Sequence, residues 1–286
     1  IENPYANLGV VENKGVEIAM DYTQKIGKNT FLTVRGNMTF NKDKIIENDQ
    51  PPVDYPWMET RGTNVNAIWG YIADGLFTSQ DEIDDHATQF GTLHVGDVKY
   101  RDLNDDGVID DYDKTVIGRG DVPRIYYGFG ADLQVGNFSI SALFQGNAQA
   151  DRYLDGISIK PFWDDEGRDN VFANITDRWR ADNPTNQDVF YPRLSVGSDG
   201  NNNNVKPSSW WVKDVSFLRL KQVNISYTLP KKWTDPLLIK NAQIYLMGTN
   251  LLTFSKFKLW DPELNTSNGT AYPNVSSYSI GLKFNF

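Results

Sequence analysis

The chain has 286 residues, a formal net charge of −9 and no cysteine. The acidic balance argues against a nucleic-acid-binding protein, and the lack of cysteine excludes disulfides, thiol catalysis and thiolate metal sites. No apolar run approaches the roughly 18 to 20 residues that a membrane-spanning helix needs. The 14 Tyr, 15 Phe and 8 Trp residues favour strands and interfacial girdles, so composition predicts a β protein, either soluble or of the membrane-barrel type.

The chain carries no signal peptide, and residues 1–8 resemble the interior of a longer protein, so we expect a fragment. Alternating apolar and polar residues then predict two strands at 15–26 and 31–41, joined by a tight turn at 27–29. The same alternation predicts a second pair of strands at 125–135 and 138–149, joined at 136–137.

The stretch 214–229 predicts a strand with a β-bulge. Its apolar series runs through Leu218 and Leu220 and then changes parity to Val223 and Ile225. One inserted residue near Lys221 or Gln222 produces such a change. A further strand is expected at 241–254, where the pattern is mixed.

The last predicted strand, at 277–286, alternates most strictly and ends on an aromatic residue. Its apolar face consists of Tyr278, Ile280, Leu282, Phe284 and Phe286. A terminal strand of this kind is typical of an outer-membrane barrel, where the last strand closes the wall.

The connections between the seven predicted strands alternate in length. Tight turns alternate with long connections of 81, 62 and 21 residues at 43–123, 150–211 and 255–275. Compact soluble sandwiches rarely carry such loops, whereas outer-membrane barrels combine short periplasmic turns with long extracellular loops. We therefore expect an all-β transmembrane antiparallel barrel. Seven strands alone cannot close a barrel of the usual even count.

The first long loop contains a twelve-residue pattern of the calcium-binding type at 102–113. Gly107 allows the sharp turn and Ile109 is the apolar anchor, whereas position 12 carries Asp in place of the usual Glu. The alternative is a solvated acidic turn, and the flanks do not predict the paired helices of a calcium sensor. The predicted ligands are Asp102, Asn104, Asp106, the carbonyl of Val108, Asp110 and Asp113.

Tryptophans concentrate in the predicted outer loops, where aromatic rings stack on sugars or pack against a partner protein. Interface anchoring and loop packing are the alternatives. Catalysis is not expected, because His86 and His94 are the only imidazoles and acid pairs such as Asp164–Asp165 are typical of solvated loops. The predicted substrate-binding residues are Trp57, Trp163, Trp210 and Trp211.

Several ordered motifs resemble the SusC/RagA-like family of TonB-linked outer-membrane transporters of Bacteroidota. The likeness covers nearly the whole chain, and its order along the sequence makes it specific. The segments that carry it lie at 70–77, 96–107, 117–118, 123–129, 177–179, 191–194, 217–220, 227–230, 248–251, 261–263 and 278–286.

This resemblance implies that residues 1–286 form the carboxy-terminal part of a 22-stranded, plugged barrel in the bacterial outer membrane. The amino-terminal strands, the plug and the TonB-contacting segment would lie outside this chain. The resemblance further implies TonB-dependent nutrient uptake, a SusD-like lipoprotein that caps the outer mouth, and an oligosaccharide or peptide as cargo.

Two alternatives remain open at this point. The chain could belong to a structural SusC-like subunit of a larger outer-membrane complex in which transport has been lost. It could instead be a secreted, calcium-stabilised β-sandwich that binds carbohydrate, which would be a soluble monomer without detergent.

Overall fold

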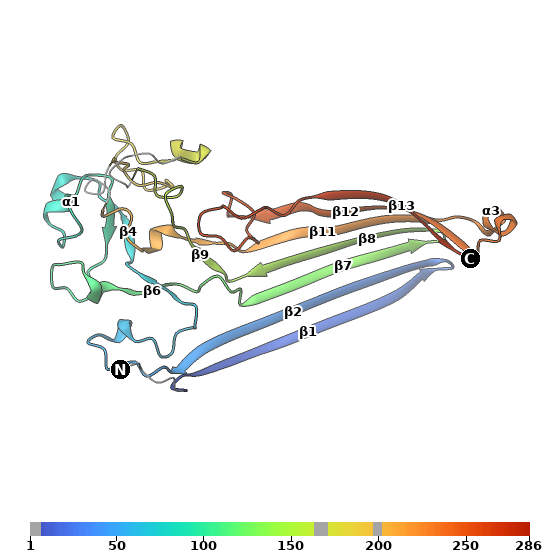
Figure 1. Ribbon diagram of the computed structural model, residues 1–286, viewed down its shortest axis with the longest axis horizontal. Helices are drawn as coiled ribbons and strands as arrows, with labels where there is room; N and C mark the ends of the chain where they lie inside the picture. Colours follow the sequence, from blue (N-terminus) through green and yellow to red (C-terminus); the bar gives the residue numbers. More distant parts are fainter. Residues whose placement is uncertain (1–6, 163–170, 197–201) are drawn as a thin grey trace, which may run out of the picture.

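A computed structural model describes residues 7–162, 171–196 and 202–286, apart from the side chain of Leu237. Its main feature is one antiparallel sheet of seven strands, whose order in space follows their order along the chain (Figure 1). The strands are β1 Val10–Gly27, β2 Thr30–Glu47, β7 Ile125–Val135, β8 Phe138–Ala148, β11 Phe217–Thr228, β12 Asn241–Ser255 and β13 Ser277–Asn285.

Shorter elements make up the connections. Three two-stranded ladders pair β3 Ile68–Gly70 with β6 Thr115–Gly118, β4 Ala73–Leu76 with β5 Val98–Tyr100, and β9 Asp151–Tyr153 with β10 Val212–Asp214. The helices are α1 Gln80–Asp84, α3 Lys231–Thr234, η1 Pro56–Met58, η2 Asp111–Asp113, η3 Ala173–Thr176, η4 Ser209–Trp211 and η5 Asp235–Leu237. None of the described helices has the length and apolarity required to span a lipid bilayer.

All seven predicted long strands are present, which confirms the all-β prediction. The strand predicted at 125–135 has the observed bounds, whereas β1 and β2 extend beyond 15–26 and 31–41. Backbone pairing between β1 and β2 continues where side-chain alternation has ended, as in the pair Lys14 and Lys42. The predicted strands were too short because register is maintained by backbone hydrogen bonds as well as by the pattern of side chains.

The two faces of the sheet differ in chemistry across all seven strands. One register row reads Tyr22, Val34, Ala131, Ala142, Val223, Gly248 and Tyr278. The adjacent row, on the opposite face, reads Thr23, Thr33, Asp132, Ser141, Asn224, Met247 and Ser279. We call these the apolar face and the polar face. On the apolar face Met20 is 62% exposed and Ile280 is 76% exposed, so no other described part of the chain covers them.

The predicted β-bulge lies in β11. The register of β11 shifts between Leu220 and Gln222 against both of its neighbours, β8 and β12. Against β8, Lys221 is the extra residue, whereas against β12 the extra residue belongs to β12, where Asn250 and Leu251 lie opposite Lys221. Lys221 lets Leu218 before the bulge and Val223 after it lie on the same face although their parity differs.

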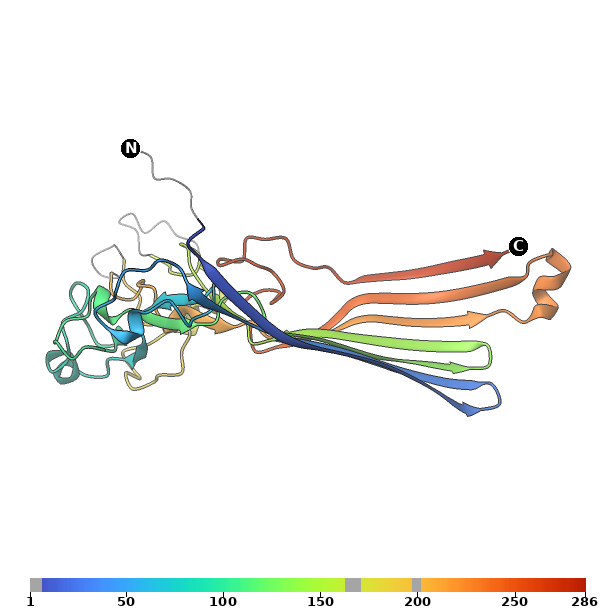
Figure 2. The same ribbon diagram turned by 90° about the horizontal axis from the view of Figure 1, so that it is seen from below.

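Short turns lie at one end of the sheet and long connections at the other (Figure 1, Figure 2). Two-residue turns join β1 to β2 and β7 to β8, and α3 with η5 occupies the connection from β11 to β12. We call the opposite end, formed by the described residues of the segments 48–162, 171–196, 202–216 and 256–276 that do not belong to the seven-stranded sheet, the outer region. The prediction had treated these segments only as loops, whereas they contain ladders, helical turns and a core.

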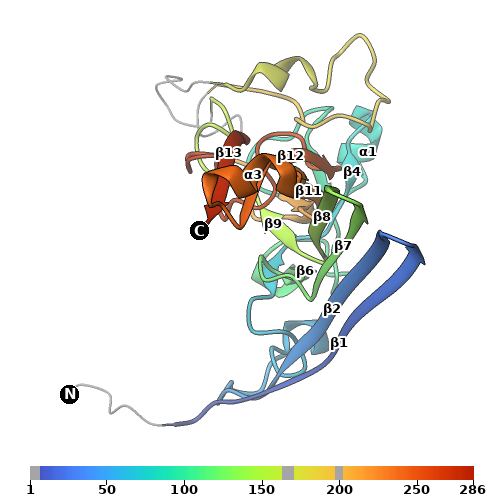
Figure 3. The same ribbon diagram turned by 90° about the vertical axis from the view of Figure 1, so that its right-hand side faces the viewer.

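Seen from its end, the sheet is curved (Figure 3). β1 and β13 are the outermost strands, and neither pairs with a further strand among the described residues. The sheet is therefore open. It is also single, unlike the two packed sheets expected for the alternative β-sandwich.

Most of the buried apolar residues belong to the outer region. One cluster contains Ala150, Leu154, Ile159, Tyr191, Trp211, Val215 and Phe257. The other contains Tyr71, Leu76, Val98, Tyr100 and Ile109. Each cluster joins segments distant in sequence, so the outer region is a folded unit at the end of the sheet.

Candidate functional site

The loop at 102–113, between β5 and β6, is closed by hydrogen bonds from its own backbone. The Asp102 carboxylate accepts the N–H groups of Asp105 and Gly107, each at 2.8 Å. The Asp113 carboxylate accepts the N–H groups of Leu103 at 2.7 Å and of Asp110 at 2.8 Å. Both end residues of the predicted calcium loop are therefore hydrogen-bonded to backbone N–H groups of the loop itself.

The backbone of this loop explains its glycine. Asp105 and Gly107 have φ values of 58° and 83°, in the left-handed region where glycine is favoured. The predicted apolar anchor Ile109 is buried, and its N–H donates to the carbonyl of Thr88 at 2.8 Å. The loop is thus fixed to the core of the outer region on one side and exposed on the other.

The predicted metal ligands lie close in the loop but are occupied by protein contacts. Asn104 Nδ2 donates to Asp106 Oδ2 at 2.8 Å, and Asp110 Oδ1 accepts the N–H of Tyr112 at 2.8 Å. In residues 7–162, 171–196 and 202–286, no three His, Asp or Glu side chains are grouped as a metal site. Each carboxylate oxygen has a second lone pair, so these contacts are compatible with cation binding. Calcium binding stays a prediction.

A buried ion pair joins two segments of the outer region. Asp97 is 1% exposed, and its carboxylate accepts Arg193 Nε at 2.7 Å and Nη2 at 3.2 Å. Asn204 Nδ2 and the N–H of His94 donate to the same carboxylate, each at 2.8 Å. The family-like segments 96–107 and 191–194 are therefore joined by one structural contact. Gly96 belongs to it as well, because a Cβ there would lie 2.3 Å from the Trp179 ring.

Three amide side chains extend the hydrogen bonding around the Asp97–Arg193 pair. They were not identified from the sequence. Gln89 accepts the N–H of Tyr100 at 2.7 Å and donates to the Val98 carbonyl at 2.9 Å, replacing a missing strand partner. Asn203 also donates to that carbonyl, at 2.7 Å, and Asn204 accepts the Val98 N–H at 2.9 Å. The only signal was an asparagine run at 201–204, and such runs are usually exposed.

The predicted aromatic contacts differ in accessibility. Trp211 is buried at 2% exposure and donates to the Asn204 carbonyl at 2.8 Å, so its ring belongs to the core. Trp210 is half-buried and donates to the Phe190 carbonyl at 3.0 Å. Trp163 lies outside the described residues. Trp57, also half-buried, stacks on Tyr55 with ring centroids 4.7 Å apart.

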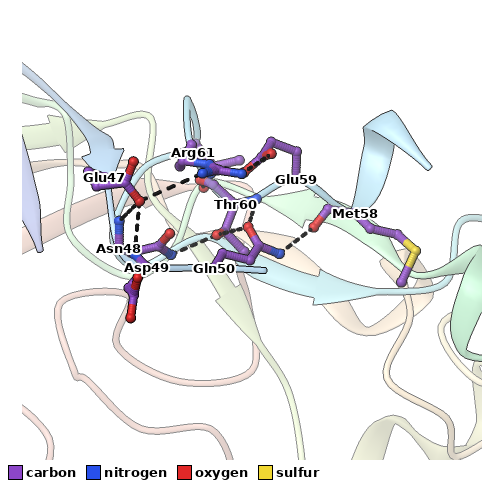
Figure 4. Close-up of polar contacts among 9 residues, drawn as sticks. Glu47, Asn48, Asp49, Gln50, Met58, Glu59, Thr60 and Arg61 are labelled. Carbon is purple, nitrogen blue, oxygen red and sulfur yellow. Dashed lines mark hydrogen bonds and ion pairs between the residues drawn. The ribbon is translucent and has the colours of Figure 1, made fainter. Parts of the chain in front are cut away.

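The segment that carries Trp57 is held at its base by polar side chains (Figure 4). Glu47 accepts the N–H groups of Asn48 and Asp49, each at 2.9 Å, and Gln50 donates to the Met58 carbonyl at 3.1 Å. Arg61 donates to Glu59 at 2.8 Å from both Nε and Nη2. These hydrogen bonds hold the pKa of Glu59 at about 2. We call this group the base cluster.

A cavity of about 550 Å³ opens in the outer region beside Lys213. Phe190 and Asp177 line it, and the Lys213 ammonium lies 5.3 Å from the centroid of the Phe190 ring. Burial lowers the pKa of Lys213, while Asp177 opposes that shift. The cavity therefore combines an aromatic wall with charges of both signs.

Comparisons with known proteins agree with the fold. TonB-dependent receptor P26 of Formosa agariphila is 32% identical over 304 residues, covering 98% of this chain and 30% of that receptor. TonB-dependent receptor SusC of Bacteroides thetaiotaomicron is 23% identical over 293 residues, covering 98% of this chain and 27% of SusC. No protein-family profile matches the chain.

Among solved structures, the RagAB peptide importer in its open-open state superposes with a TM-score of 0.73 at 20% identity. The likeness covers 97% of this chain and 29% of that one, and at this identity it shows the fold. The chain spans about 30% of the length of the curated relatives that it matches. These relatives are receptors and a transporter, in agreement with the prediction that the chain is not an enzyme.

Proposed function

Since the chain belongs to the SusC/RagA-like family of TonB-dependent receptors, we propose that it forms part of the wall and outer mouth of an outer-membrane nutrient importer. The observation that carries this proposal is the sheet itself. Its apolar face is exposed along seven strands, its short turns lie at one end, and its outer region lies at the other. Contact with lipid stabilises an exposed apolar face, whereas contact with water is unfavourable and promotes aggregation.

In this proposal residues 1–286 supply seven strands of a 22-stranded barrel, and the plug and amino-terminal strands come from receptor sequence outside this chain. The open edges at β1 and β13 support it, because each leaves a row of backbone groups that a neighbouring strand would satisfy. The polar face would line the lumen. Arg35 and Asp132, paired there at 2.5 Å, would be costly in lipid.

We propose that the outer region meets the cargo and a SusD-like lipoprotein that covers the mouth. RagAB, one structurally similar protein, is a peptide importer, and for the present chain we propose an oligosaccharide or a peptide. Trp57 and the cavity beside Lys213 are the candidate contacts, because both offer aromatic surface with polar groups nearby. Coupling to the TonB complex would lie in the part outside this chain.

The membrane placement can be tested with two neighbouring residues on opposite faces. In the full-length receptor, Ile280→Lys puts a charge on the apolar face, whereas Ser279→Lys puts it on the polar face one residue away. A lysine facing lipid near the bilayer centre costs about 2–4 kcal/mol, so Ile280→Lys should reduce the amount assembled in outer membranes. Equal assembly of both variants, or a wild-type receptor that stays soluble without detergent, would contradict the proposal.

Transport itself requires a separate measurement. A strain that lacks the receptor gene should lose uptake of the cognate oligosaccharide or peptide, and the wild-type gene should restore it. A receptor that assembles normally but whose loss leaves uptake unchanged would favour the structural-subunit alternative.

We also propose that the loop at 102–113 binds calcium and stiffens the outer region. Asp106→Asn is the suitable test, because Asp106 is exposed and contacts only loop neighbours. Asp111→Asn is the matched control, since that side chain is 85% exposed and pairs with Lys114. Calcium should protect the wild-type loop and the control variant from proteolysis, with affinity lowered at least about tenfold in Asp106→Asn. Protection independent of calcium in the wild type would refute this proposal.

A further inference from the structure

Arg152 is a buried cation to which the described residues offer no hydrogen bond or ion pair. It lies in β9 at 6% exposure, and its Nε and Nη1 atoms are buried with no hydrogen-bond partner among the described residues. Its chain neighbour Asp151 is engaged elsewhere, since both of its carboxylate oxygens accept the Arg119 guanidinium, at 2.9 and 3.0 Å. Burial lowers the pKa of Arg152, yet an arginine remains charged under all physiological conditions.

The acids closest to this guanidinium do not satisfy it. Asp121 lowers its electrostatic cost but makes no ion pair with it within 4.0 Å, and Asp121 Oδ2 already accepts Asn265 Nδ2 at 2.8 Å. Glu263 lies across the same space and pairs with Arg219 at 3.1 Å. A buried charge with no counter-charge is costly, so the site is complete only with an anion from outside these residues.

There is space for such an anion. Two cavities, of about 190 and 220 Å³, are both lined by Arg152 together with Asp121 and Asn265. The first cavity is also lined by Gln145 and Asn147, near the end of β8 that leads into the outer region. The Oδ1 atom of Asn147 is itself buried without a hydrogen-bond partner among the described residues. In the register both residues belong to the polar face of the sheet. Arg152 therefore lines open space at the junction of the sheet and the outer region.

We propose that Arg152 anchors an anion site that takes one carboxylate group. A planar guanidinium can present two N–H donors along one edge, which matches the two oxygens of a carboxylate. A singly charged anion fits better than a phosphate dianion, because Asp121 and Glu263 line the same cavity. Resting on the proposed function, this site would lie at the outer end of the lumen, on the path of the cargo.

The carboxylate has two possible sources: a soluble ligand such as a peptide carboxy terminus or an acidic sugar, or an acidic residue of another part of the receptor. The full-length receptor in detergent distinguishes them. The probe is ¹³C-labelled acetate, whose binding is measured by NMR line broadening against chloride at equal ionic strength and against phosphate. An experimental structure of the same receptor shows what lies beside Arg152.

The variants are Arg152→Met, which removes the charge, and Arg152→Lys, which keeps the charge and loses the planar donor pair. Arg152→Lys also guards against misfolding. Arg35→Met is the matched control, because Arg35 is already paired with Asp132 on the polar face. If the source is a soluble ligand, acetate binds the wild type and Arg35→Met alike. Its affinity falls at least about tenfold in both Arg152 variants, and phosphate does not compete better than acetate.

If the source is the receptor itself, acetate does not bind, and the structure shows an acidic residue from outside the present chain within hydrogen-bond distance of Arg152. Acetate binding that is unchanged in Arg152→Met overturns the proposal. So does a structure in which Arg152 pairs with Asp121, or the combination of no acetate binding and no carboxylate near Arg152. None of these outcomes depends on transport, so the anion site and the importer function succeed or fail separately.

Discussion

Replacing Asp97 with asparagine is the sharpest test of how the outer region is held together. The carboxylate is 1% exposed and accepts four hydrogen bonds, two of them from Arg193. Asparagine has nearly the same shape, but it offers one acceptor oxygen and directs an NH2 group toward donors. Breaking a buried ion pair from one side costs about 3–5 kcal/mol, because the remaining charge stays buried and unpaired.

We expect Asp97→Asn to lower the free energy of locally opening the outer region by about 3 kcal/mol, because one acceptor oxygen remains. This change corresponds to about a 150-fold larger population of molecules in which the outer region is locally open. Hydrogen exchange of the peptides around 94–98 and 191–194, in the full-length receptor, measures this population directly. The exchange of the long strands should not change. The effect is local because the pair lies outside the sheet.

The exposed pair Arg180–Asp182 provides the control. Its atoms are 2.8 Å apart, but the side chains are 60% and 64% exposed. Asp182→Asn should leave exchange measurably unchanged, because water screens such pairs. Less than a threefold difference between Asp97→Asn and Asp182→Asn would refute the view that the buried pair holds the two segments together.

Three further predictions concern the sheet and the base cluster. Gly281→Ala should destabilise the assembled receptor by about 1–3 kcal/mol in thermal unfolding, because the new Cβ would lie 2.3 Å from the Tyr245 ring. Deleting Lys221 should prevent assembly in outer membranes, since removal of the bulge turns half of β11 to the wrong face, and normal assembly would contradict the assignment of faces. The Glu59 carboxylate contributes stability that is complete above its ordinary pKa of 4.5 and is lost as pH falls toward about 2. The protection factors of the amides at 47–61, which are corrected for the intrinsic pH dependence of exchange, should therefore not vary between pH 8 and 5, and their decrease in acid should be smaller in Glu59→Gln, where only the lowered pKa of Glu47 still contributes.

The sequence predicted the sheet well because the sheet follows a local rule. Side chains on successive residues point to opposite faces, so the apolar series of β7 and the parity change at Lys221 were visible without any partner strand. The turn at 136–137 was visible for the same reason, since the alternation stops there. Strand ends were predicted less well. β2 continues to Glu47 through polar residues that pair by backbone alone.

The outer region could not be predicted in this way, because its stability comes from contacts between distant segments. Nothing local distinguishes Trp211, which is buried in a core, from Trp57, which stacks near the surface. Gln89 and Asn203 act as strand partners for Val98 from positions 9 and 105 residues away. The site at Arg152 is even harder to predict from sequence, because it is defined by hydrogen bonds that the described residues do not provide.

The separation between these contacts implies an order of folding. The β1–β2 and β7–β8 hairpins join residues close in sequence, whereas Asn204 reaches Asp97 across 107 residues, with the β7–β8 hairpin between them. Short-range pairs form before long-range ones, because each long-range contact must first close a large loop of chain. The outer region is thus completed after the hairpin has brought Gly120 and Asp151 together through their 2.8 Å backbone hydrogen bond. In a pulse-labelling experiment on the refolding receptor, protection of the amides in β7 and β8 should precede protection of Val98 and Tyr191. During that interval the local hairpins of the sheet would be formed, whereas the contacts of the outer region would not.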